Sequence, residues 1–134
     1  MNARLEAIGM QRLRDLALGW PGANALIEAS RLADPLFEAR FGEVLLGFVG
    51  FVPPSTLSDS AYVWVHTTSE ANQHRLVVAR LARRWMATFH SRYPTLFGHC
   101  VGSPGSMAWL GSLGAQFATD GSGLIQFTIE ANHD

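Results

Sequence analysis

Apolar positions recur at helical spacing along one long segment in the middle of the chain. From about Arg75 to Arg92 the apolar residues are three or four positions apart: Val78, Leu81, Ala82, Trp85 and Phe89. Because an α-helix repeats every 3.6 residues, this spacing puts them on one face and predicts an amphipathic helix, which Pro94 ends. Strand-like apolar runs at 61–67 and 95–101 flank the helix. A strand, a crossover helix and a second strand predict two parallel neighbouring strands.

The first part of the chain is predicted to be helical. Residues 4–18 carry a rough apolar stripe that predicts a helix, although a short first strand within 3–8 stays open as an alternative. A second short helix is predicted over 24–32, with Asp34-Pro35 at its end because the residue before a proline disfavours helical geometry.

The pattern then becomes strand-like. Apolar runs at 36–41 and 44–52 are separated only by Gly42-Glu43, which predicts a hairpin with a tight turn. Gly47 and Gly50 interrupt the second run, and glycines inside a strand indicate a bulge or the close approach of another backbone.

The remaining segments complete the predicted architecture. A polar loop at 55–60, a short helix reaching Leu113, a polar turn at 118–123 and an alternating strand at 124–129 are expected. Together the elements predict one domain over 1–134 with an α+β, layered α/β/α fold. Its sheet is mixed and mostly antiparallel, with one parallel strand pair and helices on both faces. A parallel pair in such a sheet offers a ligand crevice at its carboxyl ends.

Composition narrows the classes of function. The chain has 134 residues, of which 48% are hydrophobic and 16% charged, which is typical of a globular protein with its own core. Its net charge of −1 argues against nucleic-acid binding through a general basic surface. No apolar run approaches the roughly 20 residues of a membrane helix, and no signal-peptide pattern is found. The histidines lack paired ligand spacing, so no metal is expected.

The order of elements and several short motifs resemble the GNAT fold of N-acetyltransferases over most of the chain. The run at 61–67 resembles the fourth strand of that fold, and the run at 95–101 resembles the fifth. More narrowly, Trp109-Leu110, Leu113-Gly114-Ala115-Gln116-Phe117 and Ile125-Gln126-Phe127-Thr128-Ile129 resemble a family of small GNAT-like proteins of tailed phages. That family includes an internal virion protein of short-tailed phages.

The resemblance implies an acyl-CoA site at the end of the fourth strand. GNAT proteins bind the pyrophosphate there through a glycine-rich turn, but the matching positions 70–76 contain no glycine. Polar groups and free amides of the helix start remain available. The cofactor-binding residues that the resemblance implies are Val65, Thr67, Asn72, Gln73, His74, Arg75 and Ser103. Alternatively, Thr67 and Glu70 have the spacing of a capping box, which would satisfy these amides internally.

The catalytic features of the family are largely replaced. Leu110 stands where many members have a proton-donating Tyr, Ser103 where an Asn is common, and Ala115 in place of the Phe of a Gly-Phe pair. Acyl transfer to an amine needs a base, and the candidates are His66 and Glu38, with Glu43 as a further carboxylate. Structural alternatives are an ordinary strand-end histidine and solvated strand and turn charges.

Two functions follow from these features. The first is a phage-derived GNAT-like protein, a virion- or assembly-associated pseudoenzyme with degenerate or absent acetyltransferase activity. Its partners would be other virion or phage proteins, with a homo-oligomer left open, and its location the virion or the host cytoplasm. The alternative is an active N-acetyltransferase that uses acetyl-CoA and an unknown amine, without a metal.

Overall fold

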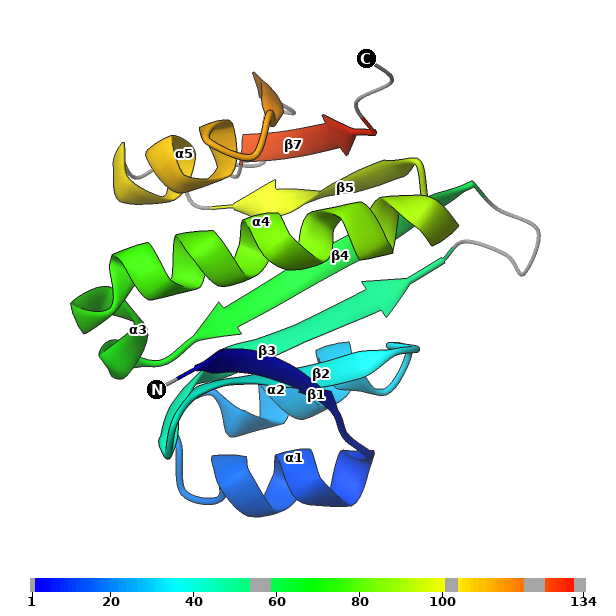
Figure 1. Cartoon of the computed structure of the whole chain (residues 1–134). Coiled ribbons are helices and arrows are strands. Elements are labelled where there is room, and N and C mark those ends of the chain that lie inside the picture. Colours follow the sequence, from blue (N-terminus) through cyan, green and yellow to red (C-terminus); the bar gives the residue numbers. More distant parts are fainter. Residues whose placement is uncertain (1, 54–58, 101–103, 120–124, 132–134) are drawn as a thin grey trace. The chain divides into compact units, whose positions relative to one another are not determined.

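The structure is a computed structural model that describes residues 2–53, 59–100, 104–119 and 125–131 (Figure 1). In chain order the elements are β1 (Ala3–Ala7), α1 (Met10–Ala17), α2 (Ala23–Ser30), β2 (Leu36–Phe41), β3 (Val44–Val52), β4 (Ser60–Thr67), α3 (Ser69–Gln73), α4 (Arg75–Arg92), β5 (Thr95–Cys100), α5 (Pro104–Gly111), β6 (Gln116–Thr119) and β7 (Ile125–Glu130). The strand order is β1-β2-β3-β4-β5-β7-β6. The pair β4–β5 is parallel, whereas β1–β2, β2–β3, β5–β7 and β6–β7 are antiparallel. The predicted α+β class with a mixed, mostly antiparallel sheet is therefore confirmed.

The chain forms two compact units. The first comprises Met1–Val52 and Val65–Val78, and the second comprises Pro53–Trp64 and Ala79–Asp134. Two elements contribute to both, because β4 and α4 each begin in one unit and end in the other. The prediction of one domain over the whole chain stays a prediction.

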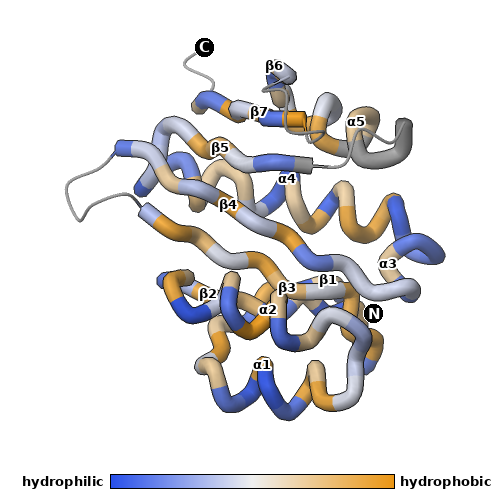
Figure 2. The backbone as a smooth tube through the Cα atoms, turned by 180° about the vertical axis from the view of Figure 1, so that it is seen from behind, coloured by the Kyte–Doolittle hydropathy of each residue, from blue (hydrophilic) through white to orange (hydrophobic). Residues whose placement is uncertain are grey.

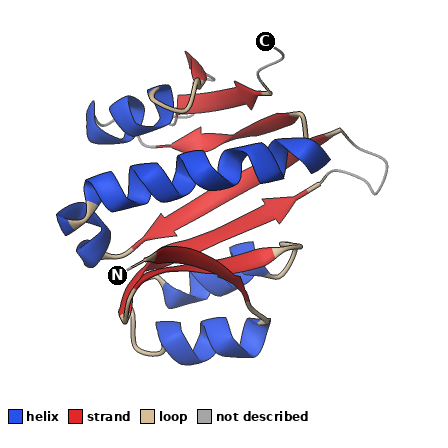
Figure 3. Ribbon diagram, viewed as in Figure 1, coloured by secondary structure: helices blue, strands red, loops and turns tan. Residues whose placement is uncertain are grey.

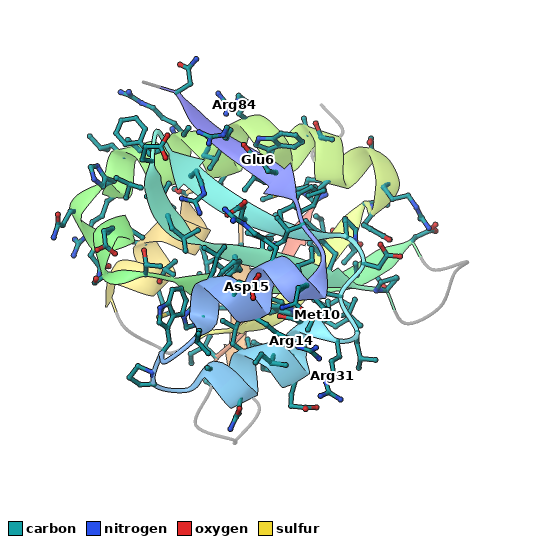
Figure 4. All side chains as sticks on the ribbon, turned by 90° about the horizontal axis from the view of Figure 1, so that it is seen from below. Glu6, Met10, Arg14, Asp15, Arg31 and Arg84 are labelled. Carbon is teal, nitrogen blue, oxygen red and sulfur yellow. The ribbon has the colours of Figure 1, made fainter. Side chains whose placement is uncertain are left out.

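The first unit is built on the β2–β3 hairpin that the sequence predicts. Figure 2 shows β3 as a largely apolar strand, whereas α1 alternates between polar and apolar residues. α1 and α2 pack against each other, and polar residues such as Arg14 and Asp15 on α1 and Arg31 beyond α2 are labelled in Figure 4. The buried apolar residues of this unit are Leu13, Ala17, Leu26, Leu36, Ala39, Leu46, Phe48, Phe51 and Ala71.

The helix predicted over 4–18 is wrong in its first half. Residues Ala3–Ala7 form β1, which pairs with β2 from Ala3↔Phe41 to Ala7↔Phe37. Gly9 then has extended backbone angles and precedes α1 as its N-cap. Leu5 and Ile8 have helical spacing by coincidence, and the strand left open as an alternative forms because β2 offers it an edge to pair with.

Gly47 accounts for both features that were expected of a glycine in β3. The β2–β3 register passes from Ala39↔Gly47 to Arg40↔Leu45, so Leu46 is an extra residue and the strand is bulged. Gly47 has a φ of 156°, and a Cβ atom at this position would lie 2.1 Å from the carbonyl oxygen of His66. The bulge and the close backbone approach are therefore both confirmed.

The second unit contains the parallel strand pair. β4 and β5 are joined from Ser60↔Thr95 to Tyr62↔Phe97, as the strand–helix–strand pattern predicts. Figure 3 shows α4 as a long helix, and its bounds match the predicted segment. Leu81 is the buried residue of its predicted apolar face, while Val78, Ala82, Trp85 and Phe89 are half-buried. The unit's buried apolar residues are Ala61, Val63, Leu81, Tyr93, Leu96, Leu110, Phe127 and Ile129.

The last predicted elements are also found, with shorter bounds. The short helix ends at Gly111 rather than Leu113, and β6 and β7 form an antiparallel pair. Most of the predicted loop at 55–60 and turn at 118–123 lies outside the described residues, while Ala118 and Thr119 belong to β6. Among the helices that the structure describes, none has the length and apolar character needed to cross a membrane.

Candidate functional site

The end of β4 carries an apolar residue that the protein leaves uncovered. β4 lies between β3 and β5 in the strand order, and its earlier residues Ala61 and Val63 are buried. Val65 nevertheless has 42% of its surface exposed, and Thr67 is exposed as well. Apolar residues of a central strand are usually buried on folding. The uncovered end of β4 is therefore a candidate ligand surface.

The parallel ladder between β4 and β5 is short. The last pair is Tyr62↔Phe97, although β4 continues to Thr67 and β5 continues to Cys100. On its other edge β5 pairs with β7 along its whole length, from Thr95↔Glu130 to Cys100↔Ile125. The parallel pairing is thus confined to the first residues of each strand.

Gly98 marks the point where the two strands are still in contact. A Cβ atom there would lie 2.5 Å from the carbonyl oxygen of Val63 and 2.7 Å from the ring of Phe127. Only glycine allows this approach from both sides, so Gly98 determines how closely β4 and β7 lie against β5.

The turn after β4 leaves the N-terminus of α3 without a side-chain cap. Thr68 is the N-cap residue, but its hydroxyl donates to the carbonyl oxygens of Leu45 at 2.7 Å and Leu46 at 3.2 Å. Glu70 accepts a hydrogen bond from the Ser69 hydroxyl at 3.2 Å. The capping box proposed for Thr67 and Glu70 is therefore wrong, because the helix begins one residue later than that motif requires. No side chain caps the amides at the start of α3.

The predicted cofactor-binding residues largely come together in the first unit. Asn72 and Gln73 are exposed on α3, and Arg75 is the exposed first residue of α4. His74 lies between the two helices and packs its ring against Phe41, with ring centroids 5.2 Å apart. With Val65 and Thr67, these residues belong to the continuous segment Val65–Val78 of that unit. Ser103 lies outside the described residues.

His66 is held from two sides at the end of β4. Its ring stacks on Trp20 at a centroid distance of 5.9 Å and an interplanar angle of 21°, and its carbonyl oxygen lies against Gly47. The side chain is half-buried, and among the described residues none hydrogen-bonds its imidazole. Trp20 is not recognisable as a site residue from the sequence, because a Trp-Pro-Gly segment indicates only a break between two helices.

Glu38 is placed differently from the solvated strand charge considered above. Its side chain is buried, and the whole residue is only 3% exposed. One carboxylate oxygen accepts a hydrogen bond from Arg40 Nε at 3.0 Å, and the other lies 3.4 Å from Arg12 Nε. The solvated-charge interpretation is therefore wrong for Glu38. Glu38 and Arg40 are two positions apart on β2, so they lie on the same face of the strand, and this spacing could have indicated the ion pair. Glu43 is exposed in the hairpin turn.

A second pair of titratable side chains lies where the parallel ladder ends. The Tyr62 hydroxyl is 3.4 Å from His99 Nδ1, and the Tyr62 ring contacts Phe97 edge-on at 5.6 Å. No sequence pattern indicates this pair, because the two residues are 37 positions apart and meet only through strand pairing. Among the described residues, no group of three or more His, Cys, Asp or Glu side chains is arranged to hold a metal ion.

Comparison with known proteins finds likeness in structure and none in sequence. No protein-family model and no curated protein sequence matches the chain. Solved structures do match it over nearly their whole length. A ribosomal-protein-alanine N-acetyltransferase from Escherichia coli has 16% identity, with 98% of this chain and 97% of that chain covered and a TM-score of 0.69.

Two further structures belong to the same class. A spermidine N-acetyltransferase from Vibrio cholerae has 14% identity, with 95% of this chain and 94% of that chain covered and a TM-score of 0.68. An acetyltransferase from Bacillus subtilis, solved in complex with CoA, has 11% identity, with 98% and 99% covered and a TM-score of 0.67. At such identities the likeness establishes the fold, which is that of the GNAT N-acetyltransferases.

Proposed function

We propose that the protein is an acyl-CoA-dependent N-acyltransferase that transfers an acetyl group to an amine. The observation that carries this proposal is the uncovered end of β4, where Val65 is 42% exposed and is followed by a helix start without a side-chain cap. An exposed apolar residue followed by a helix start without a side-chain cap suits the pantetheine arm and the pyrophosphate of CoA. The CoA complex of the similar Bacillus subtilis acetyltransferase supports the same cofactor.

In this proposal, the segment after β4 binds the pyrophosphate of the cofactor. The amides at the start of α3 and the exposed side chains of Gln73 and Arg75 are the groups that would hold the pyrophosphate. Asn72 and His74 flank them, and Val65 and Thr67 precede them on β4. Ala71 is buried where the resemblance calls for a flexible glycine turn, so the backbone is less free to wrap the phosphates. We therefore expect weaker binding than a glycine-rich turn would give.

In this proposal, His66 is the general base that accepts the proton of the amine. In such a transfer the amine, in its neutral form, would form a C–N bond to the acetyl carbon as the C–S bond to CoA breaks. CoA would leave as a thiolate, and the proton of the amine would need a base. His66 has an imidazole without a hydrogen-bond partner among the described residues, so it can accept the proton of the amine. Glu38 is the weaker candidate, since both of its oxygens already face arginines.

The second candidate function is the virion- or assembly-associated pseudoenzyme. It is favoured by Leu110, which is buried in the second unit and so leaves no proton donor at the position where many GNAT enzymes carry one. Its phage or virion partners and a homo-oligomer rest on the sequence resemblance alone. The three acetyltransferases compared above support the enzyme instead.

Titration with acetyl-CoA in a thermal-denaturation assay separates the two functions. A ligand at 100 times its Kd should stabilise the protein by roughly 2.7 kcal/mol, and CoA should act similarly because it carries the same phosphates and pantetheine arm. Pantetheine without the nucleotide is the matched control and should stabilise less. An unchanged unfolding temperature at millimolar acetyl-CoA would overturn the proposed N-acyltransferase function and favour the pseudoenzyme.

A further inference from the structure

The α1–α2 turn places an aromatic ring directly on the candidate base. Trp20 belongs to the short connection between α1 and α2, and its ring stacks on His66 at 5.9 Å with the planes 21° apart. Aromatic faces attract imidazole rings in such offset arrangements, especially when water is partly excluded. The contact joins two segments that are 46 positions apart in the sequence, so local structure alone does not produce it.

Trp20 is itself firmly anchored. Its amide donates to the carbonyl of Ala17 at 2.9 Å, and its own carbonyl accepts from the amide of Ala23 at 3.2 Å. Its ring also contacts Phe48 of β3 at 6.0 Å, and Phe48 is fully buried. The indole is therefore a rigid surface attached to the core of the first unit.

The backbone at His66 is also held by contacts, in addition to the contact of its ring with Trp20. Its carbonyl oxygen lies against Gly47 at the bulge of β3, and two residues later the Thr68 amide donates to the carbonyl of Leu46 at 2.9 Å. With backbone and ring both held, the imidazole has little rotational freedom.

We propose that Trp20 is a positioning residue that holds the His66 imidazole in the orientation required to accept the proton of the acceptor amine. The inference rests on the proposed N-acyltransferase function and deepens it. Trp20 does not exchange a proton itself and acts only through His66. Removal of the indole therefore affects turnover rather than cofactor binding.

Histidine NMR spectra test the stack without any need for turnover. The ring signal of His66 is assigned by its disappearance in His66→Gln. In Trp20→Leu, which keeps an apolar side chain beside Phe48 but has no ring current, the His66 signal should move, whereas Trp20→Phe should retain part of the shift. Phe37→Leu removes another aromatic ring of the first unit and should leave the signal in place. An unmoved His66 signal in Trp20→Leu would overturn the proposal.

Kinetics with acetyl-CoA and either spermidine or an alanine-initiated peptide supply the second test. Trp20→Leu should lower kcat by about 10²-fold, the loss typical of a misplaced catalytic group, with little change in the KM for acetyl-CoA. Trp20→Phe should recover most of the rate. Equal kcat in wild type and Trp20→Leu would overturn the positioning role alone. Failure of the wild-type protein to bind acetyl-CoA would overturn the proposed function, whatever the NMR result.

Discussion

The carbonyl oxygen of His66 occupies the space that a side chain on Gly47 would need. An ideal Cβ atom at Gly47 would lie only 2.1 Å from that oxygen and 3.0 Å from the Cα atom of Thr67. Both neighbouring atoms are backbone, so neither can move aside as a flexible side chain could. The backbone of β3 at its bulge and the backbone of the candidate base His66 are therefore in direct contact, and a change in one should displace the other.

We expect Gly47→Ala to destabilise the protein and to displace His66. The added methyl group collides with backbone, and overpacking of this kind typically costs about 1–3 kcal/mol. Chemical denaturation monitored by circular dichroism measures the loss. Gly111→Ala is the control, because nothing lies within 4 Å of a Cβ atom there and alanine favours a helix. Equal stability of Gly47→Ala and wild type would contradict the close approach.

Glu38→Gln separates a structural carboxylate from a catalytic one. The substitution keeps the shape but leaves Arg40, whose side chain is only 13% exposed, without its counter-charge. We expect a loss of about 2 kcal/mol in unfolding free energy, the scale of a hydrogen bond to a charged group. Glu28→Gln should cost less than about 1 kcal/mol, because both side chains of the Glu28–Arg31 pair are exposed. Full stability with lost turnover would instead identify Glu38 as the base.

Patterns that depend on local spacing were predicted from the sequence. The period of α4, the Gly42-Glu43 hairpin turn and the parallel β4–β5 pair all follow from side-chain periodicity and chain connectivity. The segment 3–18 shows where this reasoning fails. Leu5 and Ile8 fit a helix, but pairing with β2 is a tertiary interaction that overrides local preference.

The site was predictable only in part, for a similar reason. The candidates from Val65 to Arg75 are consecutive in the chain, so one motif locates them all. The contacts of His66 with Trp20 and of Tyr62 with His99 join segments that are distant in sequence and leave no spacing signal. The burial of Glu38 was missed because an alternating strand does not reveal which of its faces is covered.

Stability should depend on pH through Glu6 on β1, which Figure 4 labels. A hydrogen bond from Arg4, helped by the charge of Arg4 itself, lowers the pKa of the Glu6 carboxyl below its ordinary value of 4.5. A carboxyl with a lower pKa in the folded state binds fewer protons there, so it stabilises the fold above the ordinary value. That stabilisation disappears as the pH falls through the folded-state pKa.

The comparison of wild type with Glu6→Gln checks this dependence. Their difference in Tm should be present at pH 7 and should vanish progressively below pH 4.5, the ordinary value for a glutamate. The difference should be small, because nearly half of each side chain is exposed to water. A difference that grows on acidification would give the opposite sign and would exclude the Arg4–Glu6 interaction as its source.

Arg75→Ala should weaken cofactor binding without affecting the fold. Arg75 is the first residue of α4, and its side chain is exposed rather than packed in the core. A charge-assisted hydrogen bond to phosphate is worth about 1.5 kcal/mol or more, so the Kd for acetyl-CoA should rise about tenfold or more. Calorimetric titration measures the Kd, and thermal denaturation without ligand should show an unchanged Tm. Arg80→Ala removes an exposed charge from the same helix and should leave the Kd nearly as it was. If both variants weaken binding equally, the effect is one of general charge, and Arg75 has no direct part in holding the phosphates.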